Sequence, residues 1–213
     1  MSRRRGGSRG QALLETALVI PILLTLLLGV WSGGVLISDE QTATSAARAG
    51  ARLGAELGND NMSSAPFAAC QGTNHYDPCA TDAKILQNIL PVLDTAHPGT
   101  LPAAMHDATV TEIDIYRPAP CPSGVSYGTA GCPPDDGTYQ AGEPIDRFDA
   151  SGSPLPSLAG EQRYTLDLRV QLHPNEALIG VRVLYHYHSP APFLSFDTTT
   201  SEYAVMQLAP VFV

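Results

Sequence analysis

The sequence lacks the motifs that mark the common classes of enzyme active site. It has no G-x-S-x-G sequence, no Walker phosphate-binding loop, and no G-x-G-x-x-G after a predicted strand. Cys70 and Cys79 are too far apart in sequence to match the usual spacing of zinc ligands. His186 and His188 would share one face of a strand, but the sequence names no third ligand beside them. We therefore expect a protein that is not an enzyme and holds no metal or cofactor.

Negative charge is missing from the first ten residues, and this absence is informative. They contain no acid, but they hold four of the 12 basic residues, namely Arg3, Arg4, Arg5 and Arg9. The rest of the chain has 8 basic and 21 acidic residues, a net charge of −13. Because a body this acidic would be repelled by the phosphates of nucleic acids, we expect no nucleic-acid partner. The basic start predicts an N-terminus in the cytoplasm and a body outside it.

Formal charge is also absent from Ala17 to Ile37, a run of 21 residues. As a helix this run would be roughly 32 Å long, enough to cross the hydrocarbon core of a bilayer. No segment after residue 37 is apolar for long enough to form a second span. A removed secretory signal fits less well, because its apolar region usually has only about 7–15 residues. We expect a single-pass protein, with a plain signal-anchor as another interpretation.

The start of this apolar run has a recognisable order. Residues 9–21 read Arg-Gly-Gln-Ala-Leu-Leu-Glu-Thr-Ala-Leu-Val-Ile-Pro, and Glu15 is the fifth residue after Gly10. The order resembles the class III signal of type IV pilin-like proteins and, more narrowly, the TadE-like family. These are minor pseudopilins of the tight-adherence (Tad, Flp-type) pilus machinery. Residues 45–52 and the aromatic segment 185–192 are also similar to stretches of that family.

The resemblance implies a function and a set of partners. A prepilin peptidase would remove residues 1–10 by cutting between Gly10 and Gln11, and Glu15 would then act in assembly. Other pilin-like subunits, the pilus assembly platform and the lipid bilayer would be the partners, with the protein in the cytoplasmic (inner) membrane. Its place at the tip, at the base or only in the platform, and its entry into an extracellular pilus, stay open. The alternative is a single-pass anchored enzyme or binding domain whose site is not recognised.

One helix is predicted from about Ala12 to Leu57, crossing the membrane at about residues 17–37. Pro21 removes one backbone hydrogen bond inside it, so we expect a kink or local unwinding there. Small residues recur at four-residue spacing and suggest close packing against helices of neighbouring subunits, although an Ala/Gly-rich composition would give the same pattern. The packing residues expected from this pattern are Gly29, Gly33, Gly50 and Gly54. The Leu53 and Leu57 side is expected to face the protein's own sheet.

Residues 58–213 are expected to form an extracytoplasmic pilin-like domain. Apolar residues at three- and four-residue steps predict an amphipathic helix from Thr81 to about Leu93. Alternating patterns predict strands at 109–117, 164–172, 179–188 and about 203–213. Four short strands joined by loops or hairpins imply an antiparallel sheet half-covered by the helices. The fold class is therefore α+β.

Residues 118–159 are rich in Pro and Gly and are expected to be an extended surface loop. Its acids are expected to be solvated turn residues rather than a calcium site, because their spacing matches no EF-hand: Asp135, Asp136, Glu143, Asp146 and Asp149. Two disulfides are expected to close loops, and local pairing is the simplest of three connectivities. It joins Cys70 to Cys79 and Cys121 to Cys132.

Overall fold

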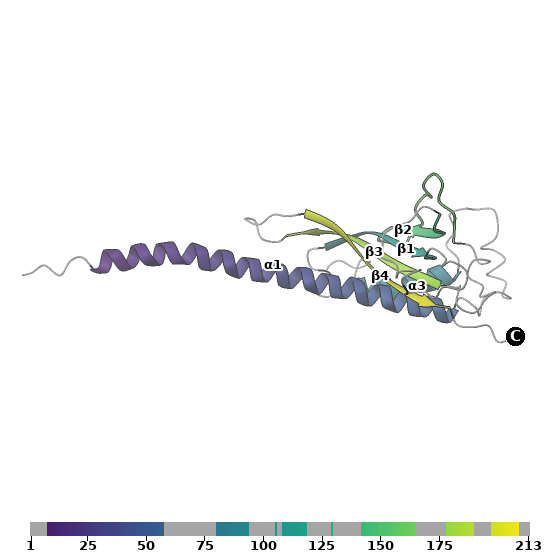
Figure 1. Cartoon of the computed structure of the whole chain (residues 1–213), viewed down its shortest axis with the longest axis horizontal. Coiled ribbons are helices and arrows are strands. Elements are labelled where there is room, and N and C mark those ends of the chain that lie inside the picture. The colour runs from purple at the N-terminus through teal and green to yellow at the C-terminus, as the bar shows by residue number, and fades with distance from the viewer. Residues whose placement is uncertain are drawn as a thin grey trace, which may run out of the picture.

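The computed structural model describes residues 8–57, 80–93, 105, 108–118, 129, 142–164, 178–189 and 197–208. A long helix, α1 (Ser8–Leu57), carries a small sheet and a second helix, α3 (Ala80–Leu93), along its C-terminal half (Figure 1). The N-terminal half of α1 projects beyond these elements (Figure 1). This arrangement confirms the predicted α+β class, with a long N-terminal helix, a small antiparallel sheet and a further helix. All four cysteines lie outside the described residues, so the disulfide-closed loops stay a prediction.

α1 is an unbroken helix of 50 residues, which corresponds to roughly 75 Å. It ends at Leu57 as predicted and begins at Ser8, four residues earlier than predicted. Pro21 lies inside it, and the helix continues through the proline without the expected unwinding. A helix this long cannot be buried by so small a domain, so part of its surface must meet another environment.

The sheet has four antiparallel strands in the order β2-β1-β3-β4. They are β1 (Ala108–Tyr116), β2 (Ile145–Phe148), β3 (Leu178–His188) and β4 (Asp197–Gln207). The strands predicted at 109–117 and 179–188 are confirmed to within one residue. The last strand begins at Asp197, six residues before the predicted start. The prediction missed this start because residues 197–201 are all polar and show no apolar alternation. The strand predicted at 164–172 lies outside the described residues apart from Tyr164.

The prediction of an extended surface loop at 118–159 is wrong for β2. This strand pairs with β1, so that Phe148 lies opposite Ile113 and Ile145 opposite Tyr116. Ile145 and Phe148 are both buried. Four residues are too few to show an alternating pattern inside a Pro- and Gly-rich segment, and their burial comes from pairing with a distant strand.

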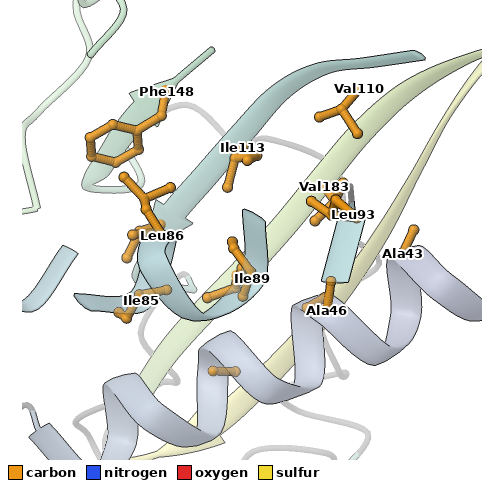
Figure 2. Close-up of a cluster of buried hydrophobic side chains, with 14 of the residues drawn as sticks. Ala43, Ala46, Ile85, Leu86, Ile89, Leu93, Val110, Ile113, Phe148 and Val183 are labelled. Atoms are coloured by element: carbon orange, nitrogen blue, oxygen red, sulfur yellow. The ribbon is translucent and has the colours of Figure 1, made fainter. Parts of the chain in front are cut away.

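The hydrophobic core lies between one face of the sheet and the two helices. In Figure 2 the apolar side chains of α3, Ile85, Leu86, Ile89 and Leu93, point into the space between α1 and the sheet. The apolar spacing predicts these four residues and Leu90 as one face, and Leu90 packs at the edge of the core, partly buried. Burying one such side chain stabilises the fold by about 1.5–3 kcal/mol. The helix was therefore predicted correctly in its extent and in its packing on the sheet.

β3 runs antiparallel to α1 along the C-terminal half of the helix. We call the contacts between α1 and the β3–β4 pair the seam. Along the seam, each step forward on β3 meets a residue nearer the N-terminus of α1. Ile179 contacts Gly54, Val181 contacts Gly50 and Tyr187 contacts Ser32, while Glu202 of the neighbouring β4 contacts Thr44. The β3–β4 pair therefore extends along α1 from near its C-terminus back to Ser32.

Candidate membrane and assembly surface

The N-terminal part of α1 has an unusually apolar and exposed surface. It is long and apolar enough to cross a membrane once, and its most apolar window has a mean hydropathy of 2.4 with none of it buried within the protein. Exposed large side chains run from Leu13 to Trp31, both of which are more than half exposed, and Ile37 is a further one beyond them. A soluble monomer rarely exposes so continuous an apolar surface. This stretch is therefore a candidate membrane anchor.

From Ser32 onward one face of α1 is covered by the protein's own sheet, whereas Gly34, Ile37 and Ser38 stay exposed. Ser32 is only 4 % exposed, and its carbonyl oxygen accepts a hydrogen bond from the hydroxyl of Tyr187 at 3.0 Å. Asp39, further along α1, is completely buried. The helix thus passes from an apolar segment without buried residues to a segment with one face covered by its own sheet. This transition comes about six residues before the end of the span expected at residues 17–37.

The residues expected to act in processing and assembly lie at the start of α1. Gly10 and Gln11 lie in its first turn, and Glu15 lies about one turn further on, with an exposed side chain. Within the apolar segment, the hydroxyl of Thr25 donates to the carbonyl oxygen of Pro21 at 2.8 Å. A polar group satisfied inside its own helix can enter a bilayer at low cost.

Gly29 and Gly33 lie near the end of the exposed stretch and are half-buried. A Cβ added to Gly33 would have nothing within 4 Å. Beside them, a shallow hollow on the helix is lined by Val30, Trp31, Gly34, Val35 and Ser38. The packing of Gly29 and Gly33 against another helix stays a prediction.

Gly50 and Gly54 serve a different contact from the one expected. Both are buried inside the subunit: a Cβ at Gly50 would lie 2.9 Å from Ile89 Cγ2, and one at Gly54 would lie 2.5 Å from Ile179 Cδ1. The glycines let α3 and β3 approach the backbone of α1 closely. The core face of α1 is otherwise made of alanines: Ala43, Ala46, Ala47, Ala51 and Ala55. The expected partner was a neighbouring subunit, and the close packing is instead within the chain.

The Leu53 and Leu57 side was expected to face the sheet, but these two leucines are only half-buried. The small-residue face takes that place because helix and strand backbones can come closer there. The four-residue glycine spacing signalled close packing correctly, and what it could not signal was whether the partner belonged to the same chain.

The opposite face of the sheet holds a buried ion pair. Arg182 of β3 contacts Asp114 of β1 through Nε and Nη2, each 2.8 Å from Oδ2. The same guanidinium lies 4.9 Å from the centre of the Tyr116 ring. Gly180, opposite Tyr116 in register, makes room for that ring, because an added Cβ would lie 2.6 Å from it. Burial raises the pKa of Asp114 to about 7, against the opposing charge of Arg182.

A second set of ion pairs ties β2 to its neighbours. Arg147 pairs with Glu112 of β1, with Nη2 2.8 Å from Oε2, and its Nη1 lies 3.8 Å from Glu161. Burial alone would raise the pKa of Glu112, but hydrogen bonds, chiefly from Arg147, hold it below its ordinary value. These contacts fix the strands relative to each other. In both sets the charged side chains are paired with one another, which is a structural role.

The acids of the predicted surface loop are only partly solvated. Asp149 behaves as a turn residue, because its Oδ1 accepts hydrogen bonds from the backbone of Ser151 and Ser153. Glu143 and Asp146 are buried, and Asp146 pairs with Arg163, so the expectation of solvated turn residues is wrong for both. Asp135 and Asp136 lie outside the described residues. The burial follows from β2, which carries this segment into the fold.

The two histidines of β3 lie near the far end of the strand. His188 contacts Asp197 through Nδ1, and Nε2 of His186 lies 4.0 Å from the same carboxylate. Within the described residues, no group of three or more His, Cys, Asp or Glu side chains could hold a metal ion. His188 is exposed and His186 is half-buried, with Nδ1 of His186 3.3 Å from the hydroxyl of Thr199 on β4.

Packing of α1 on the sheet was predicted from the sequence, but the residues of the seam and its extent to Ser32 were not. Tyr185 and Tyr187 alternate along β3 and point to α1, and burial raises the pKa of Tyr185 above its ordinary value, with Glu202, Glu40 and Asp39 adding to the rise. The alternation of two tyrosines with two histidines signalled one buried and one exposed face. The sequence did not indicate that the buried face meets the end of the predicted membrane span.

The model of the TadE-like protein family matches residues 10–52. This range begins at Gly10, includes Glu15 and the exposed apolar stretch, and ends on the part of α1 that packs against the sheet. The resemblance read from the sequence is confirmed over these residues. No curated protein and no solved structure matches the chain.

Proposed function

From the TadE-like match over residues 10–52, we propose that this chain is a pilin-like minor subunit of a Tad-type pilus assembly or secretion machine. Its role would be structural rather than catalytic. The observation that carries the proposal is the coincidence of this match with a helix whose first half is apolar and exposed. A pilin-like subunit needs such a helix, first as an anchor in the bilayer and later as a contact with other subunits.

The fold supports a division of labour between the two halves of α1. The C-terminal half is committed to the subunit's own core through its alanine and glycine face. The N-terminal half, from Leu13 to Trp31, makes no comparable contact with the described part of the domain. Contacts with neighbouring subunits would therefore come mainly from this half. The sheet domain would be carried as a rigid unit outside the membrane.

Glu15 calls for an explanation in this scheme. A charged side chain in a spanning helix costs about 2.5–3.5 kcal/mol at the bilayer centre and less near its edge. Cleavage after Gly10 would create an α-amino group at Gln11, which is largely positively charged at neutral pH. In a low-dielectric setting, this amine of one subunit and Glu15 of a neighbour would attract each other strongly. The pair would offset the cost of the carboxylate and set the axial stagger of the helices.

The test is the N-terminus of the mature protein in cells that have the peptidase. We expect Gln11 as the first residue, no cleavage in Gly10→Leu, and normal cleavage but reduced assembly in Glu15→Gln. Glu40→Gln is the matched control, because Glu40 is also an exposed acid of α1 but lies beyond the apolar stretch. It should be cleaved and assembled normally.

A mature N-terminus at Met1, or one beyond residue 31, would refute the proposal. Either result would favour the alternative of an anchored or secreted enzyme or binding domain. An effect of Glu40→Gln equal to that of Glu15→Gln would remove the special role of Glu15.

A further inference from the structure

We propose that the end of the β3–β4 pair is a second membrane contact, which rests on the zwitterionic headgroup layer of a phospholipid bilayer. We call this surface the hairpin end; it consists of His186–His188 and Asp197–Thr199. The proposal depends on the membrane anchoring included in the proposed function. It adds a surface of the sheet domain, and a kind of partner for it, that anchoring alone does not imply.

The first step places the edge of the hydrocarbon layer. The exposed stretch from Leu13 to Trp31 corresponds to about 28 Å of helix, and a bilayer core is about 30 Å thick. If this stretch spans the core, its outer edge falls at Trp31 and Ser32. Trp31 is 67 % exposed, and tryptophan is enriched where lipid chains meet headgroups.

The second step places the hairpin end at the same level. The hydroxyl of Tyr187 is bonded to the carbonyl of Ser32, and β3 runs toward the N-terminus of α1 at this point. His188 is one residue further along the strand and lies opposite Asp197 in register. Measured along the axis of α1, the pair therefore lies near the level of Ser32, at the predicted edge of the hydrocarbon.

The chemistry of the hairpin end fits headgroups rather than lipid chains or open water alone. His188, Asp197, Thr198 and Thr199 are exposed and supply hydrogen-bond donors and acceptors, while the apolar Tyr187 ring is turned toward α1. The sequence between His188 and Asp197 contains no formal charge. A surface with one carboxylate and two imidazoles suits zwitterionic lipid, whereas the strongly acidic remainder of the domain would be repelled by anionic lipid.

The test uses the fact that Trp31 is the only tryptophan of the chain. Full-length protein is reconstituted in phosphatidylcholine vesicles whose acyl chains carry bromine, a tryptophan quencher, either close to the headgroup or near the chain end. Trp31 should be quenched more by the shallow bromine. In a Trp31→Phe background, His188→Trp should show similar shallow quenching and a blue-shifted emission.

Two further variants test whether quenching is specific to the hairpin end. Gln207→Trp, in the same background, places the probe at the opposite, exposed end of β4 and should show no quenching. Thr199→Trp reports the hairpin end from the neighbouring strand, and it should agree with His188→Trp. Circular dichroism spectra that match wild type establish that each variant is folded.

The outcomes separate this proposal from the one on which it rests. Quenching of Trp31 with water-exposed, unquenched probes at 188 and 199 would overturn the headgroup contact while leaving the anchor intact. An unquenched Trp31 would overturn the anchor and the headgroup contact together. The peptidase test is independent of both, because it concerns cleavage after Gly10.

Discussion

At Gly50 the missing side chain determines how closely α1 can lie against the core. A Cβ there would meet three atoms at once: Ile89 Cγ2 at 2.9 Å, Ile85 Cγ2 at 3.2 Å and Val181 Cγ1 at 3.3 Å. All three are branches attached to the β-carbon, so none can move without turning its whole side chain. At Gly54 the two nearest atoms are terminal methyl groups, Cδ1 of Ile179 and of Ile85. Such methyl groups have more freedom to move.

We therefore predict that Gly50→Ala destabilises the protein more than Gly54→Ala. Overpacking costs about 1–3 kcal/mol, and the gain in helix propensity returns only about 1 kcal/mol. The net loss at Gly50 should be up to about 2 kcal/mol, and that at Gly54 should be smaller. Thermal unfolding of the full-length variants in detergent micelles, followed by circular dichroism, measures both. Gly33→Ala is the control without nearby atoms and should not destabilise; a Gly50→Ala protein as stable as wild type would contradict the packing described.

The seam between α1 and the β3–β4 pair is the feature that matters most among the elements. Its two tyrosines occupy similar buried positions on β3 but differ in their hydroxyl groups. That of Tyr187 donates to Ser32, whereas that of Tyr185 has no hydrogen-bond partner in the described part of the chain. Removing the same atom from each should therefore have opposite consequences.

For Tyr187→Phe we expect a loss of about 0.5–1.5 kcal/mol, the usual net value of a hydrogen bond. For Tyr185→Phe we expect no loss or a small gain, because a buried hydroxyl without a partner is itself costly. Native-state hydrogen exchange of the β3 and β4 amides near the hairpin end would show the difference as faster exchange in Tyr187→Phe alone. Equal protection in the two variants would mean that the bond to Ser32 does not hold the seam.

The helices and strands could be predicted from the sequence where the pattern of apolar residues was strong and local. α3, β1 and β3 were predicted to within one residue, because their apolar spacing is regular and each is nine or more residues long. α1 was predicted to its last residue from its apolar run and helix-forming composition, but it begins four residues earlier. β2 and the first half of β4 were missed, since Ile145–Phe148 is short and Asp197–Ser201 has no apolar residue. The role of Gly50 and Gly54 was only half predicted, because spacing along a helix gives the distance of approach and not the identity of the neighbour.

For the candidate surface, the sequence located Gly10, Gln11 and Glu15 by their order, and the family match covers that segment. The outer limit of the exposed helix could not be predicted, because Ser32 is covered by a strand about 155 residues later in the chain. Hydropathy alone extended the span to Ile37. Only tertiary contacts show that the helix surface changes its surroundings earlier.

On the scale of the whole molecule, this earlier limit predicts where a charge can be tolerated. Leu24 and Ile37 are almost equally exposed, at 53 % and 54 %, but only Leu24 lies in the exposed stretch that ends at Trp31. Arginine at the centre of a spanning helix costs about 2.5–3.5 kcal/mol on insertion scales. Leu24→Arg should therefore reduce membrane integration strongly, while Ile37→Arg should leave it nearly unchanged. Resistance of the protein to alkaline extraction from membranes measures integration.

Equal loss of integration in the two variants would place Ile37 as deep in the bilayer as Leu24, and would contradict an outer limit near Trp31. Leu24→Ala is a suitable control for the loss of a large side chain without the gain of a charge, and it should integrate normally.

The antiparallel seam also imposes an order of events during synthesis. Thr44 and Glu202, which bond across it, are 158 residues apart, and Tyr187 and Ser32 are 155 apart. Contacts between such distant residues form late, because a long loop must close first. The alanine and glycine face of α1 leaves the ribosome early but can receive its strand only when the last part of the chain has been synthesised. In the proposed topology, the subunit would therefore reach its native state after translocation, from a helix already held in the bilayer.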